Sequence, residues 1–331
     1  MMSSKPFDKL NVKKILVVSL TNVGDVILTF PVLDILLEDF SDSELSVVVG
    51  PKARELLDQN PLIKNVYVFD KKGSPLEKWR WVNLLRQERF DLVIDLRHTA
   101  IPFFIGAKYR TSFRRMNGKK GQHIRSQHLR RLQEVYDYRE SANHRSALYI
   151  SSLDKAVIDQ QLKNFEIEDQ PFIVMSPGAA HHLKCWTPSG FAQVGNWLME
   201  RDHYKIVLVG DRNEISMNIG ITEQMRQRAL NLTGKTTLPQ LAELLHRSAG
   251  VIANDSAVMH LASYLDVPTL AIFGPTNEAK YGPWGARCRV IRRELFCAPC
   301  EKSACRYQHE CMQLLDPKDV YAAFEKNVLK S

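Results

Sequence analysis

The sequence lacks any hydrophobic run long enough to cross a lipid bilayer. A membrane-spanning helix needs about 20 consecutive apolar residues, and no stretch of the 331 residues approaches that length. The apolar stretch from Ile15 to Leu20 is too short for the core of a signal peptide, and Asp25 soon follows it. We therefore expect a cytoplasmic protein whose six cysteines are reduced.

The glycine-rich loops of the common nucleotide-binding motifs are also absent. No dinucleotide fingerprint and no phosphate loop ending in Gly-Lys-Ser/Thr follows any expected strand. These absences remove most of the support for a nicotinamide-dependent or ATP-hydrolysing enzyme. The chain also contains no short-period repeat and no low-complexity tract.

Acidic residues are missing from one segment. Residues 97–133 contain ten Lys or Arg and no Asp or Glu, although the whole chain carries a net charge of only +8. The rest of the chain therefore has a net charge of −2, and the basic character is local. Such a patch favours an anionic partner, namely a phosphorylated ligand, a lipid head group or nucleic acid. The alternative is an ordinary solvated face.

Elsewhere, short apolar strands alternate with amphipathic segments, which is typical of a parallel α/β sheet. The pattern runs from Lys14 to Leu96, is interrupted by the basic segment, and restarts at Phe172. We predict two doubly wound domains, residues 1–168 and 169–331. Ligands of such sheets bind beyond the carboxyl ends of the strands, so the loops at those ends are the candidate sites.

One of these loops carries the run from Ala253 to His260. It places Asp255, Ser256 and His260 where a buried strand ends and a helix begins, with Asp255 or Ser256 as the N-cap. Unpaired N–H groups at the positive end of a helix dipole suit a nucleotide diphosphate. The alternative is an ordinary cap beside a core histidine.

Three further charged residues lie in equivalent loops. Asp25 follows Gly24 directly after the first strand, and we expect that glycine to permit a tight turn. Lys184 lies in the loop after the strand at Phe172, where a cation can neutralise a diphosphate. Glu214 begins the next helix and can accept sugar or ribose hydroxyls. The alternatives are helix-start carboxylates and a surface lysine.

The C-terminal part contains Cys297, Cys300, Cys305 and Cys311, with His309 between the last two. The number and softness of these ligands fit zinc. The irregular spacing favours a reduced structural cluster instead.

Several motifs occur together in a recognisable order. They are Val23-Gly24-Asp25-Val26 with Pro31, Pro177-Gly178-Ala179 with Lys184 and Trp186, the run from Asn254 to His260, Val267-Pro268-Thr269, and Phe273-Gly274-Pro275-Thr276. Together they resemble glycosyltransferase family 9, the ADP-heptose:lipopolysaccharide heptosyltransferases, and are closer to the heptosyltransferase II type. The resemblance covers nearly the whole chain.

The resemblance implies the GT-B fold, with two facing Rossmann-like domains that have parallel sheets. The acceptor would bind the first domain and the nucleotide sugar the second, with the last helix (about 317–331) crossing back to the first domain. It also implies an inverting transfer that uses no metal and no cofactor, with Asp25 as general base. The donor-binding residues would be Ala179, Lys184, Glu214, Asp255, Ser256, Ala257 and His260.

The acceptor is expected to be the anionic inner core of lipopolysaccharide at the cytoplasmic face of the inner membrane. The candidate acceptor-binding residues are Asn22, Gly24, Arg97, Arg114 and Arg115, and the expected donor is ADP-heptose or a related nucleotide sugar. Phe103 and Phe104 would add a shallow apolar contact with the acceptor.

Two other classes of function stay open. A nucleic-acid-binding protein would account for the pI of about 9.1, but the basic segment lacks interleaved aromatics and any recognised binding motif, so we expect no nucleic-acid partner. A catalytically silent sugar-binding module is conceivable because Ala257 stands where the family usually has glycine.

Overall fold

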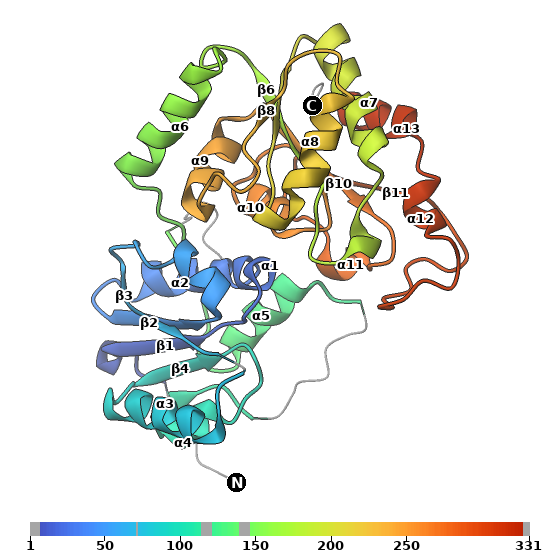
Figure 1. Ribbon diagram of the computed structural model, residues 1–331. Coiled ribbons are helices and arrows are strands. Elements are labelled where there is room, and N and C mark those ends of the chain that lie inside the picture. Colours follow the sequence, from blue (N-terminus) through green and yellow to red (C-terminus); the bar gives the residue numbers. More distant parts are fainter. Residues whose placement is uncertain (1–6, 71, 114–120, 139–145, 327–331) are drawn as a thin grey trace. The chain divides into compact units, whose positions relative to one another are not determined.

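The computed structural model describes residues 7–70, 72–113, 121–138 and 146–326, and the chain divides into two compact units (Figure 1). The units are Met1–Tyr149 and Ile150–Ser331. The division lies before the predicted boundary at 168/169, because helix α6 (Ser152–Asn164) packs against helix α9 (Leu238–Arg247) of the second unit. An ion pair of 2.5 Å between Arg247 and Asp159 joins these two helices.

The first unit contains a five-stranded parallel sheet in the order β3-β2-β1-β4-β5. Its central strand is a run of β-branched and aliphatic residues that is buried on both faces, as expected for a parallel sheet. The strands are β1 (Lys14–Val18), β2 (Glu44–Val49), β3 (Ile63–Val68), β4 (Leu92–Asp95) and β5 (Tyr109–Arg110). The helices are α1 (Val23–Ile27), α2 (Phe30–Asp39), α3 (Pro75–Gln87), α4 (Ile101–Ile105) and α5 (Ile124–Gln133), with 3-10 turns η1 (Lys9–Asn11) and η2 (Pro51–Leu56).

The second unit contains a six-stranded parallel sheet in the order β11-β10-β9-β6-β7-β8. The strands are β6 (Phe172–Ser176), β7 (Lys205–Leu208), β8 (Leu230–Asn231), β9 (Gly250–Asn254), β10 (Thr269–Phe273) and β11 (Cys288–Arg292). Besides α6 and α9, the helices are α7 (Pro188–Arg201), α8 (Ile215–Glu223), α10 (Ala257–Tyr264), α11 (Glu278–Tyr281), α12 (Glu310–Gln313) and α13 (Pro317–Phe324), with 3-10 turns η3 (His182–Lys184) and η4 (Arg212–Glu214).

The chain's last helix belongs to the second unit. Val320 and Phe324 of α13 are fully buried in the core formed by α7 and the sheet, and α13 packs directly on α7. The described part of α13 therefore packs within the second unit, and the crossing of residues 317–331 to the first unit stays a prediction. Residues 327–331 lie outside the described residues.

Local signals in the sequence set several helix starts. Ser74, Ser151 and Thr237 each accept a backbone hydrogen bond from the residue three positions on, forming capping boxes at α3, α6 and α9. Within the described part of the chain, no helix combines the length and the apolar composition that a bilayer crossing requires.

Candidate active site

Three loops of the second unit converge where strands β10, β9 and β6 end. These strands are neighbours in a parallel sheet, so their carboxyl ends share one edge. Thr276 follows β10, Asp255 follows β9, and Lys184 lies in the loop after β6. Lys184 Nζ is 2.7 Å from Asp255 Oδ2, and Thr276 Oγ1 donates a 2.7 Å hydrogen bond to the same oxygen. Asp255 is only 5% exposed, so one cation and one hydroxyl hold a buried carboxylate.

Asn254 fixes the loop that carries Lys184. Its side chain is fully buried at the end of β9. Asn254 Nδ2 donates to the Pro177 carbonyl at 2.6 Å, and its Oδ1 accepts from the Trp186 backbone N–H at 3.1 Å. One amide therefore ties both ends of the loop to the neighbouring strand, which defines where Lys184 lies.

Helix α10 begins beside this cluster. Ser256 occupies the N-cap position, as predicted, but it makes no side-chain capping bond, and its Oγ is buried without a hydrogen-bond partner among the described residues. Ala257 is the first helical residue, where backbone N–H groups have no intrahelical acceptor. His260 is buried one turn further on, and its ring stacks on Trp284 with centroids 6.1 Å apart. His260 is thus packed into the interior, the arrangement expected of a core histidine.

Glu214 lies at the same sheet edge, after strand β7. Its carboxylate accepts a 2.8 Å hydrogen bond from the Asp211 backbone N–H. Gly178 approaches so closely that a Cβ there would lie 1.9 Å from the carboxyl group of Glu214. Burial raises the pKa of Glu214 above its usual range. Ala179 follows Gly178 and is half-buried. The loop after β6 thus contains both Gly178, which contacts Glu214, and Lys184, which pairs with Asp255.

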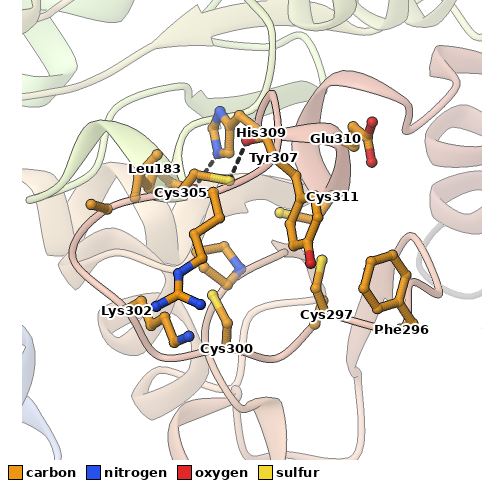
Figure 2. A pocket seen from close by; sticks show the side chains of 14 residues that line it. Leu183, Phe296, Cys297, Cys300, Lys302, Cys305, Tyr307, His309, Glu310 and Cys311 are labelled. Carbon is orange, nitrogen blue, oxygen red and sulfur yellow. Dashed lines mark hydrogen bonds between the residues drawn. The ribbon is translucent and has the colours of Figure 1, made fainter.

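The cysteine-rich part borders these loops. All six cysteines are free, and the four between Cys297 and Cys311 line a cavity of about 330 Å³ together with Leu183 and Pro275 (Figure 2). Burial, together with the other three cysteines of this group, raises the pKa of Cys311 to about 11. Among the residues that the structure describes, no three His, Cys, Asp or Glu side chains are grouped closely enough to hold a metal ion.

In the first unit, Asp25 and Arg97 follow the neighbouring strands β1 and β4, so they lie at one edge of that sheet. Asp25 is in the first turn of α1 and accepts a 2.9 Å hydrogen bond from Asn22 Nδ2. Gly24 is the second residue of that helix and does not have a positive φ, contrary to the turn we predicted for it. The close approach occurs instead at Gly50, where a Cβ would lie 2.4 Å from the Thr21 carbonyl oxygen.

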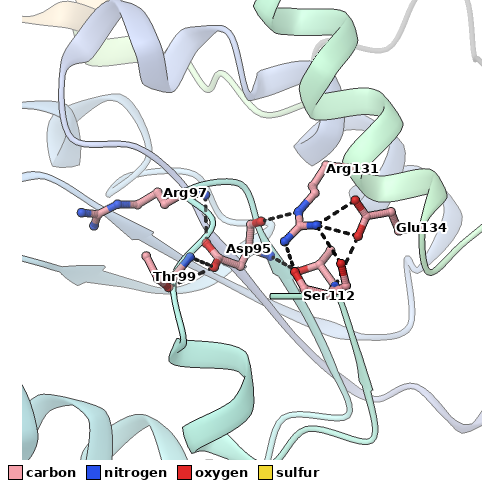
Figure 3. Close-up of polar contacts among 7 residues, drawn as sticks. Asp95, Arg97, Thr99, Ser112, Arg131 and Glu134 are labelled. Atoms are coloured by element: carbon pink, nitrogen blue, oxygen red, sulfur yellow. Dashed lines mark hydrogen bonds and ion pairs between the residues drawn. The ribbon is translucent and has the colours of Figure 1, made fainter. Parts of the chain in front are cut away.

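A buried arginine organises the loop after β4 (Figure 3). Arg131 of α5 is 3% exposed, donates to the Asp95 carbonyl at 3.1 Å, and forms two hydrogen bonds of 2.7 and 2.6 Å with Glu134. The Asp95 side chain accepts from the backbone N–H of Arg97 at 2.9 Å, and the guanidinium of Arg97 lies 4.7 Å from the centroid of the Phe69 ring. Burial raises the pKa of Asp95 and lowers that of Arg97.

The basic segment is therefore not one uniform surface patch. Arg131 is buried in the interior of the first unit, and the guanidinium of Arg97 packs against the Phe69 ring. Arg114 and Arg115 lie outside the described residues.

The structure brings the predicted donor-binding residues to one edge of the second sheet, and the predicted Asn22, Asp25 and Arg97 to one edge of the first. Sequence reasoning did not name Thr276, Asn254 and Gly178 as site residues, although they belong to the motifs and loops that it singled out. Asn254 ends β9, whereas Gly178 and Thr276 lie two and three residues after β6 and β10.

Comparisons with known proteins identify the family of this chain. A sequence model of glycosyltransferase family 9 (heptosyltransferase) matches residues 79–310, more than half of the chain. The chain belongs to glycosyltransferase family 9. It is therefore a glycosyltransferase enzyme. Among curated proteins, it is 25% identical over 288 residues to lipopolysaccharide heptosyltransferase 3 of Escherichia coli, covering 79% of this chain and 83% of that protein.

Solved structures show the same fold. A family 9 glycosyltransferase from Veillonella parvula matches with a TM-score of 0.81 and 26% identity, covering 98% of this chain and 99% of that one. The ADP-heptose lipopolysaccharide heptosyltransferase II of E. coli matches with a TM-score of 0.75 and 22% identity, covering 96% and 99%. The chain thus has the GT-B fold. Similarity to both a type 3 and a type II enzyme does not single out type II, which stays a prediction.

Proposed function

We propose that this family member is an inverting heptosyltransferase that moves heptose from ADP-heptose to the inner core of lipopolysaccharide. The observation that carries the proposal is the cluster of Lys184, Asp255 and Thr276 beside the start of α10. A cation and free backbone N–H groups at a helix N-terminus suit a leaving group that gains negative charge. A nucleoside diphosphate leaving from a sugar is such a group.

The second unit would bind the donor. Lys184 and the first N–H groups of α10, from Ala257 onward, would hold the diphosphate, with the unpartnered Ser256 Oγ as an additional donor. Glu214 would accept hydrogen bonds from ribose or sugar hydroxyls. Ala179 and His260 would shape the walls of the site. The similarity to the ADP-heptose lipopolysaccharide heptosyltransferase II of E. coli supports this donor.

In the first unit, Asp25 would be the general base. As the acceptor oxygen attacks the anomeric carbon from the face opposite the diphosphate, Asp25 takes the hydroxyl proton. The bond between the anomeric carbon and the diphosphate oxygen breaks, and its electron pair leaves with ADP. Configuration at the anomeric carbon is thereby inverted. Asn22, which donates to Asp25 Oδ2, would orient the carboxylate.

The acceptor would bind the same edge of the first sheet as Asp25. Asn22, Gly24 and Arg97 lie there in the described structure. We also assign Arg114 and Arg115 to the acceptor, because the inner core is anionic and these arginines belong to the basic segment.

We further propose that the first unit docks on the cytoplasmic face of the inner membrane. Helix α3 packs against α4. Trp79 of α3 is 64% exposed, and Phe103 and Phe104 of α4 are 65% and 58% exposed. Lys78 and Arg80 flank Trp79 in the sequence. Exposed aromatics beside basic residues suit the interface of an anionic membrane.

Vesicle co-sedimentation tests the docking. The double variant Phe103→Ser/Phe104→Ser should bind anionic phospholipid vesicles more weakly than the parent, while Leu153→Ser, a change at a 72% exposed leucine of the second unit, should not. Equal binding by all three proteins would contradict this membrane face.

The donor is tested by measuring melting temperatures with ADP-, UDP- and GDP-sugars. A ligand that binds only the folded protein raises the melting temperature, by about 5 °C or more at a hundredfold excess over Kd for a unit of this size. We expect ADP-heptose to give the largest shift. A shift with UDP- or GDP-sugars alone would instead indicate a relative that uses another donor.

A further inference from the structure

The segment 301–315, here called the brace, is attached to the loops of the proposed donor site at several points. It follows β11, is irregular from Glu301 to Tyr307, and then forms α12. Glu301 N–H donates a 2.7 Å hydrogen bond to the Pro275 carbonyl, next to Thr276. Trp186 Nε1 donates to the Leu315 carbonyl at 3.1 Å. The brace thus contacts both the loop of Thr276 and the loop of Lys184.

Packing supports these hydrogen bonds. Gly274 directly follows β10. A Cβ at this position would lie 2.4 Å from the Met312 sulfur and 3.0 Å from the Cys311 sulfur. Cys311 and Met312 are both buried. The start of α12 therefore packs against the loop that contains Thr276.

The most direct contact is made by His309. Its ring Nε2 donates a 2.5 Å hydrogen bond to the backbone carbonyl of Leu183, the residue before Lys184 (Figure 2). Leu183 and Lys184 belong to the short 3-10 turn η3 (His182–Lys184). His309 itself has a left-handed backbone, with φ of 59°. That conformation is costly for most residues with a side chain, so the surrounding contacts must maintain it.

We propose that His309 is a positioning residue for donor binding, which fixes turn η3 through the Leu183 carbonyl and so holds Lys184 beside Asp255. The proposal rests on the assignment of Lys184 to the donor diphosphate. His309 does not touch the donor in this scheme. Its loss removes one restraint on the turn, in addition to those from Asn254 and Asp255, so more of the ordering of Lys184 must occur on binding and affinity falls.

The test uses His309→Asn in the full-length protein. Asparagine tolerates a left-handed backbone but is too short to keep the bond to Leu183. We expect the Kd for ADP, measured by calorimetry, to rise about five- to tenfold, the loss expected for one hydrogen bond. The KM for the nucleotide sugar should rise similarly, with kcat changed less than twofold. His309→Gln, which keeps an N–H donor of similar reach, should restore most of the affinity.

The chain offers a matched control. His203, between α7 and β7, is exposed and has the same φ of 59°. His203→Asn makes the same chemical change at the same backbone conformation, and it should leave ADP binding unchanged. An equal loss of affinity in both variants would overturn the proposal.

A double-mutant cycle separates positioning from general stabilisation. If His309 acts through Lys184, His309→Asn should weaken ADP binding little further in a Lys184→Ala background. Additive losses would contradict the proposal, as would His309→Asn binding ADP as tightly as the parent. Failure of the parent itself to bind ADP would instead overturn the proposed donor site, and this inference with it.

Discussion

Lys184 Nζ lies 2.7 Å from Asp255 Oδ2, although 71 positions separate the two residues in the sequence. The pair is asymmetric, since the lysine side chain is 29% exposed and the aspartate side chain 5%. Asp255 is therefore buried and also held by Thr276, whereas Lys184 is partly exposed. The carboxylate holds the cation at the sheet edge where we propose that the diphosphate binds.

Replacing this lysine should weaken donor binding. We expect Lys184→Ala to raise the Kd for ADP about 10- to 100-fold, because one charged hydrogen bond to the diphosphate is lost. Calorimetry provides the measurement. Lys163→Ala, at an exposed lysine near the end of α6, is the control and should bind as the parent does. Unchanged affinity in Lys184→Ala would exclude Lys184 from the donor site.

The contact between Gly178 and Glu214 should tolerate no side chain. A Cβ at Gly178 would overlap the Glu214 carboxyl group, so Gly178→Ala should lower the free energy of unfolding by about 1–3 kcal/mol and weaken ADP binding. Gly220→Ala is the control, because Gly220 lies in α8 with open space around its Cα. There the added methyl group should stabilise the helix by about 0.5–1 kcal/mol. Equal effects at the two positions would contradict the close approach at Gly178.

The buried carboxyl group of Glu214 should give a pH-dependent stability. Burial raises the pKa of Glu214 in the folded protein above its ordinary value of 4.5. Between these two pKa values, the folded protein binds more protons than the unfolded chain. Stability therefore falls as pH rises from about 4.5 through the raised folded-state pKa. We expect Glu214→Gln to gain stability relative to the parent over this range, as measured by urea unfolding at several pH values. Glu223→Gln, at an exposed carboxylate at the end of α8, should show no such trend.

The bounds of the central strands in both sheets could be predicted closely. These strands are buried on both faces, so each one is a continuous apolar run in the sequence. The apolar run from Leu45 to Val49, for example, predicts a strand, and the observed strand is Glu44–Val49. The two-residue strands β5 and β8 were missed, because so few residues carry no periodic pattern. The residues from Asp25 to Phe40 predict one helix, but two are observed. The break lies near Thr29, whose hydroxyl donates back to the Val26 carbonyl, and α2 then begins with Pro31 in its first turn.

The site could be predicted in its composition but not in its contacts. The sequence places Lys184, Glu214 and Asp255 in loops after strands, and parallel pairing then brings those loops to one edge. Which side chains meet depends on strand order and side-chain direction. The hydrogen bond of His309 to Leu183 spans 126 positions and comes from an irregular segment, so no local pattern indicates it.

The most direct test of the catalytic proposal compares Asp25→Asn with the parent, using ADP release from ADP-heptose in the presence of a lipopolysaccharide inner-core acceptor. Asparagine keeps the size of the side chain but cannot take the acceptor proton, so kcat should fall about 10²- to 10⁴-fold. The Kd for ADP should stay within twofold of the parent value, and Asp42→Asn, at an exposed aspartate after α2, should behave as the parent. Retention of parental turnover by Asp25→Asn would contradict the assignment of Asp25 as general base.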